Sequence, residues 1–136
     1  MLIAFLSDIH GNLPALEAAF GDARTRGATR FICAGDMTGY GPFPDGVCRF
    51  LRERRIPAII GNYDQKAIEV AKRGAPAADR MKQKKRKILL WTAAHLGEGS
   101  RRYLAGLPER IVQRLSGGYE LLVVHGSPLS MEDAIY

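Results

Sequence analysis

The feature that most constrains the fold is the alternation of short apolar runs with amphipathic segments. Four apolar runs are typical of strands: Leu2–Leu6, Arg30–Ala34, Ala58–Ile60 and Glu120–Val124. The segments Leu13–Arg24 and Pro44–Arg55 separate the first three runs, and their apolar residues recur at the spacing of one helix face. This order predicts a βαβαβ unit, and hence a layered α/β fold with mostly parallel strands and covering helices.

The rest of the chain adds helices and one further strand. From Gln65 to about Gly106 the pattern is mostly helical, Glu109–Leu115 predicts an extra strand, and Gly117–Gly118 predicts a turn into the last run. A length of 136 residues suits one domain better than two. We therefore expect residues 1–136 to form a single domain.

The composition argues against a membrane or secreted protein. Hydrophobic residues make up 46% of the chain and charged residues 25%, as in ordinary soluble proteins. No window approaches the ~18 consecutive apolar residues of a membrane span, and Asp8 interrupts an N-terminal run that lacks the basic start of a signal peptide. Cys33 and Cys48 form no CxxC pattern, so we interpret them as reduced structural cysteines of a cytoplasmic protein.

A residue able to bind a metal ion follows the end of every apolar run. These residues are Asp8, His10, Asp36, Asn62 and His125. In open α/β sheets, ligands bind beyond the carboxyl ends of the strands, and parallel strands bring those ends to one edge. We therefore expect the five side chains to converge, although they lie far apart in sequence.

Each of these residues also has a simpler interpretation. Asn62 can cap the helix that follows it, a single histidine at a strand end is commonly structural, and the neighbouring glycines can serve turns. The pair Asp8 and His10 is the most specific signal, because both side chains can reach one ion from a short loop. Four coincidences of residue type and position favour one site over four unrelated roles.

The ligand types limit the metal. Carboxylate, amide oxygen and imidazole without thiolate favour Mn, Fe, Zn or a similar ion over a sulfur-rich structural zinc site. The single carboxylate of Asp36 can bridge two ions. Two ions roughly 3.5–4 Å apart can hold an activated water and polarise a phosphoryl oxygen together.

Four ordered motifs then carry a family resemblance. DIHGN at 8–12, GDMTGYGP at 35–42, GNYD at 61–64 and VHGSP at 124–128 resemble the motifs of calcineurin-like metallophosphoesterases, above all the small prokaryotic single-domain phosphodiesterases. The likeness runs from Leu2 to Tyr136. It implies hydrolysis of phosphodiester or phosphomonoester bonds by a metal-activated water at a binuclear site with two divalent transition-metal ions, such as Mn, Fe, Zn or Ni.

The resemblance also assigns roles to the five residues. It implies that Asp8 and His10 bind one ion. Asp36 would bridge the two ions. Asn62 and His125 would bind the second, and Asn62 would also contact the substrate phosphate.

The chain departs from the family pattern in two places. Family members usually continue with a Gly-His-x-His motif that completes both metal shells, and this sequence has none. We therefore expect the N-terminal portion of a larger fold, incomplete at the C-terminus, without its second sheet and last two ligands; we interpret His95 as structural. The third motif often has a histidine, proposed to protonate the leaving group, where Tyr63 stands. Tyrosine, with an ordinary pKa of about 10, is a weak acid for this role at neutral pH, and we expect Asp64 to orient its neighbours.

The net charge of +6 arises from one segment, Arg80–Lys87. It holds six of the 20 basic residues and no acidic one, and without it the charges balance. On a helix, Met81 and Ile88 share a stripe, which predicts a solvated helix with one buried edge. The alternative is attraction of phosphate-bearing substrates or nucleic acid, although no nucleic-acid motif accompanies the segment. We place Trp91, beyond the run, in the core.

Two functions stay open at this stage. The first is the metal-dependent phosphoesterase acting on a phosphate-ester substrate. The second is a non-catalytic binding or scaffold protein on the same fold, like the retromer subunit of this superfamily, and Tyr63 and the missing motif favour it. The sequence does not decide the substrate, the native metal, or whether the chain forms a homo-oligomer.

Overall fold

Two short parallel strands lead into the site. In the computed structural model, which describes residues 1–133, β1 (Ile3–Leu6) pairs in parallel with β2 (Arg30–Cys33). The third expected strand, Ala58–Ile60, is reduced to a single parallel bridge between Ala58 and Cys33. The predicted βαβαβ order is confirmed, with a third strand shorter than expected. The expected domain end at Tyr136 lies outside the described residues.

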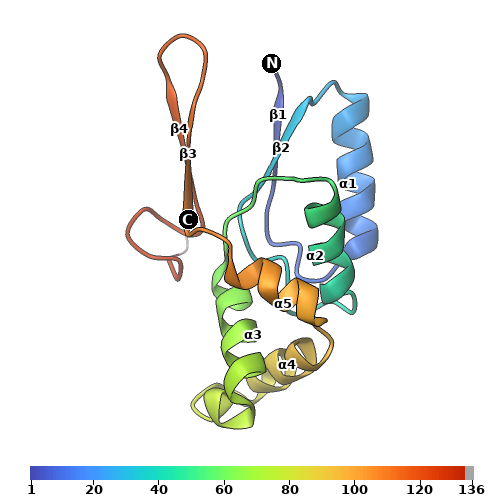
Figure 1. The fold of residues 1–136 in the computed structure, drawn as a ribbon, viewed down its shortest axis with the longest axis vertical. Coiled ribbons are helices and arrows are strands. Elements are labelled where there is room, and N and C mark those ends of the chain that lie inside the picture. The colour runs from blue at the N-terminus through green and yellow to red at the C-terminus, as the bar shows by residue number, and fades with distance from the viewer. Residues whose placement is uncertain (134–136) are drawn as a thin grey trace.

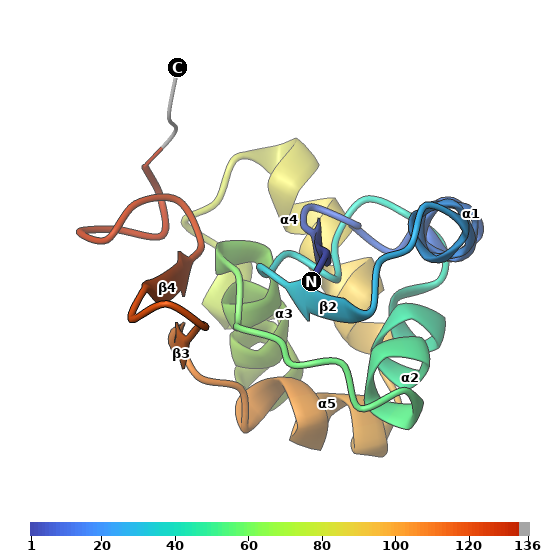
Figure 2. The ribbon, with the colours of Figure 1, turned by 90° about the horizontal axis from the view of Figure 1, so that it is seen from above.

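Two helices make the crossovers between these strands, as predicted. In α1 (Leu13–Thr25), the Asn12 side chain caps the first turn by accepting from Ala15 N at 3.1 Å. The second helix, α2 (Pro44–Glu53), has Pro44 in its first turn, where the missing N–H costs nothing. Figure 2 shows both helices on the same side of the β1–β2 ribbon.

The predicted helical region divides into α3 (Asn62–Arg73), the 3₁₀ helix η1 (Ala75–Ala78), α4 (Gln83–Ala94) and α5 (Glu98–Ala105). The basic segment is helical only from Gln83 onward, so Arg80 to Lys82 precede the helix that we predicted. Trp91 was wrongly placed in the core: it is 41% exposed and stacks on His95. None of the helices described is long and apolar enough to cross a bilayer.

The last two strands form a hairpin of their own. β3 (Arg110–Arg114) and β4 (Glu120–Val124) pair antiparallel, and the turn glycines Gly117 and Gly118 both have positive φ. The extra strand and the turn are therefore confirmed. One expectation was wrong: β4 does not extend the parallel strands but forms a separate two-stranded sheet with β3. The reason is the short link between the strands, which allows an antiparallel hairpin and excludes a parallel crossover.

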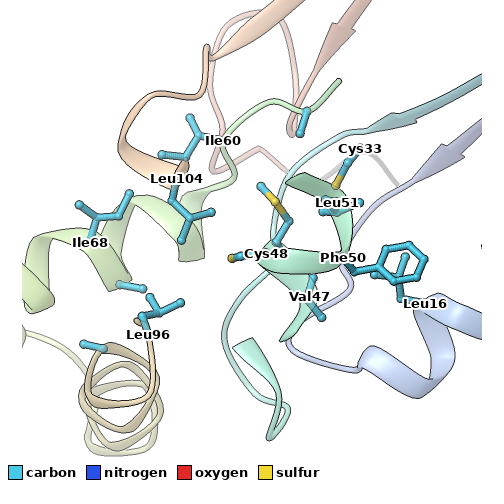
Figure 3. Close-up of a cluster of buried hydrophobic side chains, with 14 of the residues drawn as sticks. Leu16, Cys33, Val47, Cys48, Phe50, Leu51, Ile60, Ile68, Leu96 and Leu104 are labelled. Carbon is cyan, nitrogen blue, oxygen red and sulfur yellow. The ribbon is translucent and has the colours of Figure 1, made fainter. Parts of the chain in front are cut away.

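Two apolar clusters hold these parts together. The larger cluster lies among the helices and the faces of β1 and β2 that point toward them. It contains the free, buried Cys33 and Cys48 (Figure 3). The smaller joins Ile32 and Ile59 to Val123 of β4. The hairpin therefore packs on the side of the strands away from α1 and α2 (Figures 1 and 2), and this packing brings the residue after β4 to the end of β2.

Candidate metal centre

The loops that follow β1 and β2 run side by side and continue the strand pairing. Asp8 N donates to Gly35 O at 3.1 Å, His10 N to Asp36 O at 2.9 Å, and Gly11 N to Met37 O at 2.8 Å. This pairing brings together side chains from two different motifs. One ligand atom each of Asp8, His10 and Asp36 lies within 4.8 Å of the others.

The backbone at these three residues is unusual. Asp8, His10 and Asp36 have φ values of 54°, 48° and 52°, in the left-handed region that residues other than glycine rarely adopt. Among the described residues, Arg55 is the one other non-glycine residue with positive φ. Such strained conformations cluster at functional sites, where the surrounding structure holds them in place.

Both histidines are oriented by a backbone carbonyl. His10 Nδ1 lies 3.0 Å from Thr38 O, and His125 Nδ1 lies 2.8 Å from Ala34 O. A carbonyl oxygen can only accept, so each Nδ1 donates a proton to it, and Nε2 is the ring nitrogen left to bind a metal ion. This arrangement is common for ligating histidines, because the second ring nitrogen fixes the orientation of the first.

Asp36 stands between the two histidines. Its Oδ1 accepts from Tyr63 N at 2.8 Å, while its Oδ2 lies 3.7 Å from His10 Nε2 and 3.6 Å from His125 Nε2. The residue is 3% exposed. Burial raises the pKa of its carboxyl group above the ordinary value, although the Tyr63 N–H and the two histidines oppose the shift.

Asp64 is a buried residue that organises the site from behind. Its carboxylate accepts from Met37 N, Thr38 N, Thr38 Oγ1 and Gly61 N at 2.8–3.2 Å. These bonds hold the loop after β2 against the start of α3, as expected of an orienting residue. Burial and the nearby Asp36 raise the pKa of Asp64 to about 6.

Asn62 and the other four candidates line one cavity, and this cavity has a volume of about 440 Å³. It does not cap α3: Gly61 is the capping residue, and Asp64 binds its N–H. The Asn62 amide instead donates to Glu132 Oε2 at 3.1 Å. The structure thus brings all five predicted residues to one cavity. Among the described residues, Asn62 forms no hydrogen bond with any of the other four.

Several residues around the cavity were not anticipated in these roles. Glu132 reaches Asn62 and forms an ion pair with Lys66, and Tyr40 shares a hydroxyl hydrogen bond with Tyr63. The Tyr63 ring packs edge-on against His10, with centroids 5.2 Å apart, and Lys85 Nζ lies 4.6 Å from its centroid. The sequence showed Lys85 only as one member of the basic segment. Which of these basic residues lies beside the cavity depends on how the helix packs.

The donor set fits a divalent cation. The two Nε2 atoms face Asp36 Oδ2, and Asp8 Oδ1 lies 3.7 Å from His10 Nε2. Carboxylate oxygens and imidazole nitrogens this close together can share one positive charge. Carboxylate and imidazole without thiolate suit Mn, Fe, Zn and related ions. The cysteines are excluded as ligands because they are buried in the helical cluster.

Comparisons with known proteins identify the family of the chain. The family model of the calcineurin-like phosphoesterase superfamily domain matches residues 1–135. A metallophosphoesterase from Sphaerobacter thermophilus is 32% identical with a TM-score of 0.73; the match covers 98% of this chain and 51% of that one. A hypothetical protein from Pyrococcus horikoshii OT3 is 27% identical with a TM-score of 0.86, over 99% and 59% of the two chains.

A curated relative shows the same relation of lengths. An uncharacterised protein of Methanocaldococcus jannaschii is 29% identical over 127 residues, which are 93% of this chain and 50% of that protein. The mixed α/β fold is the one that these metallophosphoesterase structures share. The chain belongs to the calcineurin-like phosphoesterase superfamily. It spans about half the length of the relatives it matches.

Proposed function

We propose that this chain supplies a binuclear metal centre for the hydrolysis of phosphodiester or phosphomonoester bonds. The observation that carries the proposal is the position of Asp36 Oδ2 between two histidine Nε2 atoms, at 3.7 and 3.6 Å. A carboxylate shared in this way suits two ions. Membership of a metal-dependent hydrolase family supports the same chemistry.

We assign Asp8 and His10 to one ion and His125 and Asn62 to the other, with Asp36 shared. The proximity of Asp8, His10 and Asp36 supports the first group. The His125–Asp36 approach and the shared cavity support the second. Asn62 would bind the ion through Oδ1, whereas its contact with Glu132 uses Nδ2.

The bound ions would act as Lewis acids toward a phosphoryl oxygen and the attacking water. The protein fixes the geometry around them. The carbonyls of Thr38 and Ala34 orient the two imidazole rings through Nδ1 and leave Nε2 for the ions, and the Tyr63 N–H holds the Asp36 carboxylate in place. Once released from Glu132, the Asn62 amide can donate to a phosphate oxygen of the substrate.

The test is hydrolysis of a chromogenic aryl phosphodiester in the presence of Mn²⁺. Asp36→Asn keeps the shape of the side chain and weakens metal binding, so we expect the rate to fall at least about 100-fold. Asp22→Asn is the matched control, because Asp22 lies on α1 and pairs with Arg26 at the surface. Equal rates for Asp36→Asn and the unmodified protein would overturn the proposal.

One observation favours the alternative of a non-catalytic binding protein. At the place where relatives often carry a proton-donating histidine, Tyr63 directs its hydroxyl to Tyr40. Metal analysis separates the two functions. Stoichiometric binding of transition metal supports the enzyme, whereas a protein that binds no metal supports the scaffold.

A further inference from the structure

Two lysines from different helices meet beside the candidate metal centre. Lys66 lies on α3 and Lys85 on α4, and both are partly buried although lysine is normally exposed. Burial, followed by contact with the Lys66 ammonium, lowers the pKa of Lys85. Two like charges are therefore held close together, which costs free energy unless an anion lies near them.

The anion now beside them is a carboxylate of the chain itself. Glu132 forms an ion pair with Lys66 Nζ through Oε1 and accepts from Asn62 Nδ2 through Oε2 at 3.1 Å. One carboxylate thus pairs with Lys66 while Lys85 lies over the Tyr63 ring, and a group with more negative charge would match the two ammonium groups better.

The lysines lie next to the metal-ligand candidates but do not line their cavity. Lys85 reaches the cavity through the Tyr63 ring, which also contacts His10, and Lys66 reaches it through Glu132. If a phosphoryl group of the substrate lies among Asp8, His10, Asp36 and His125, the two lysines lie beside it. They would then face the next group of the same substrate.

We propose that Lys66 and Lys85 bind a second phosphate group of the substrate, joined through an anhydride oxygen to the phosphoryl group that is cleaved, and that Glu132 is the internal anion it displaces. The inference rests on the proposed function and narrows its substrate class to compact polyphosphates. A polynucleotide would need a continuous row of available cations and therefore fits less well. On the same helix Arg86 pairs with Asp79, whereas Lys84 and Lys87 are exposed. The basic segment thus places one lysine, Lys85, beside the site and does not form a continuous cationic surface for a nucleic-acid backbone.

The experiment compares the affinities for inorganic pyrophosphate and inorganic phosphate by calorimetry, at one fixed concentration of free Mn²⁺. In Lys66→Met and Lys85→Met, we expect the preference for pyrophosphate to fall about tenfold each, the loss of one charge-assisted contact. Phosphate affinity should stay the same. Glu132→Gln should change the preference in the opposite direction, because it removes the competing anion.

Lys84→Met is the matched control, since Lys84 is an exposed neighbour of Lys85 on α4. It should leave the preference unchanged, and Lys85→Arg should restore it. An unchanged preference in Lys66→Met and Lys85→Met, or an equal fall in Lys84→Met, overturns this inference and leaves the metal centre standing. If the unmodified protein binds neither anion with Mn²⁺, the proposed function fails and the inference fails with it. Lysine-dependent binding of oligothymidylate without a pyrophosphate preference also overturns it.

Discussion

At the scale of single residues, two glycines decide how closely the ligand-bearing loops approach. A Cβ atom on Gly35 would lie 2.8 Å from Gly61 Cα and 2.9 Å from His125 Nδ1. A Cβ atom on Gly61 would overlap with both Asp36 N and Asp36 Oδ1. The loop after β2 and the start of α3 therefore pack backbone against backbone, with the His125 ring against Gly35, and the candidate centre depends on these contacts.

The clash at Gly61 gives a prediction. Gly61→Ala must push Asp36 away from its present position, because the colliding atoms are backbone as well as side chain. We expect Mn²⁺ affinity to fall and thermal stability to decrease. Gly21→Ala is the control: Gly21 lies within α1 with no atom near the added methyl group, so stability should rise by about 0.5–1 kcal/mol.

Isothermal titration with Mn²⁺ and thermal melts of both variants provide the measurement. If Gly61→Ala bound Mn²⁺ as tightly as Gly21→Ala, the close packing of these loops would not be needed for the centre.

The difference between these residues explains how far the sequence could predict the site. The convergence of Asp8, His10, Asp36 and His125 at one cavity was predictable, because their types and their places after apolar runs are local features. The contacts of Glu132 and Lys85 were not, since each depends on how a distant segment packs. The Asp64 network also needs the fold, because two of the N–H groups it binds belong to Met37 and Thr38, far away in sequence.

At the scale of helices and strands, the predictable elements are those with local signals. Spacing of apolar residues predicted α1 and α2, and paired glycines predicted the turn between β3 and β4. The sheet to which β4 belongs was not predictable from its apolar run alone. It depends on the short link to β3 and on the contact of Val123 with Ile32 and Ile59.

Asp45 joins two helices through their first turns. It lies at the start of α2, and its Oδ1 accepts from Gly97 N, the capping residue of α5, at 2.9 Å. A hydrogen bond from Ser100, followed by the one from Gly97, lowers the pKa of Asp45 despite partial burial. The carboxylate therefore stabilises the folded state at a pH above its ordinary pKa of about 3.9.

This contact predicts a pH-dependent stability. At pH 7, Asp45→Asn should lower the free energy of unfolding by roughly 0.5–1 kcal/mol, a modest value because the side chain is partly exposed. As the pH falls through the lowered folded pKa, Asp45 becomes protonated, and the difference in stability between the unmodified protein and the Asp45→Asn variant should disappear. Urea unfolding of both proteins at pH 7 and near pH 3 measures this difference in the free energy of unfolding. A difference that stayed constant over this range would contradict the assigned ionic contact.

At the scale of the whole molecule, the candidate centre connects segments that otherwise share few contacts. The hairpin β3–β4 stands apart from the helices in Figure 1 and meets the parallel strands through the small cluster of Ile32, Ile59 and Val123. His125, directly after β4, adds a polar contact through Ala34 O. A metal ion shared between His125 and Asp36 would therefore tie the hairpin to the rest of the fold.

This connection predicts that metal binding stabilises the entire structure. A ligand at about 100 times its dissociation constant stabilises the state that binds it by about 2.7 kcal/mol, so saturating Mn²⁺ should raise the melting temperature by several degrees. His125→Ala should reduce the rise, because the second ion loses a ligand and the hairpin loses its tie. His95→Ala, which removes an exposed histidine stacked on Trp91, should keep the full rise. Thermal melts with and without Mn²⁺ make the comparison, and an equal rise in both variants would place the stabilising metal away from His125.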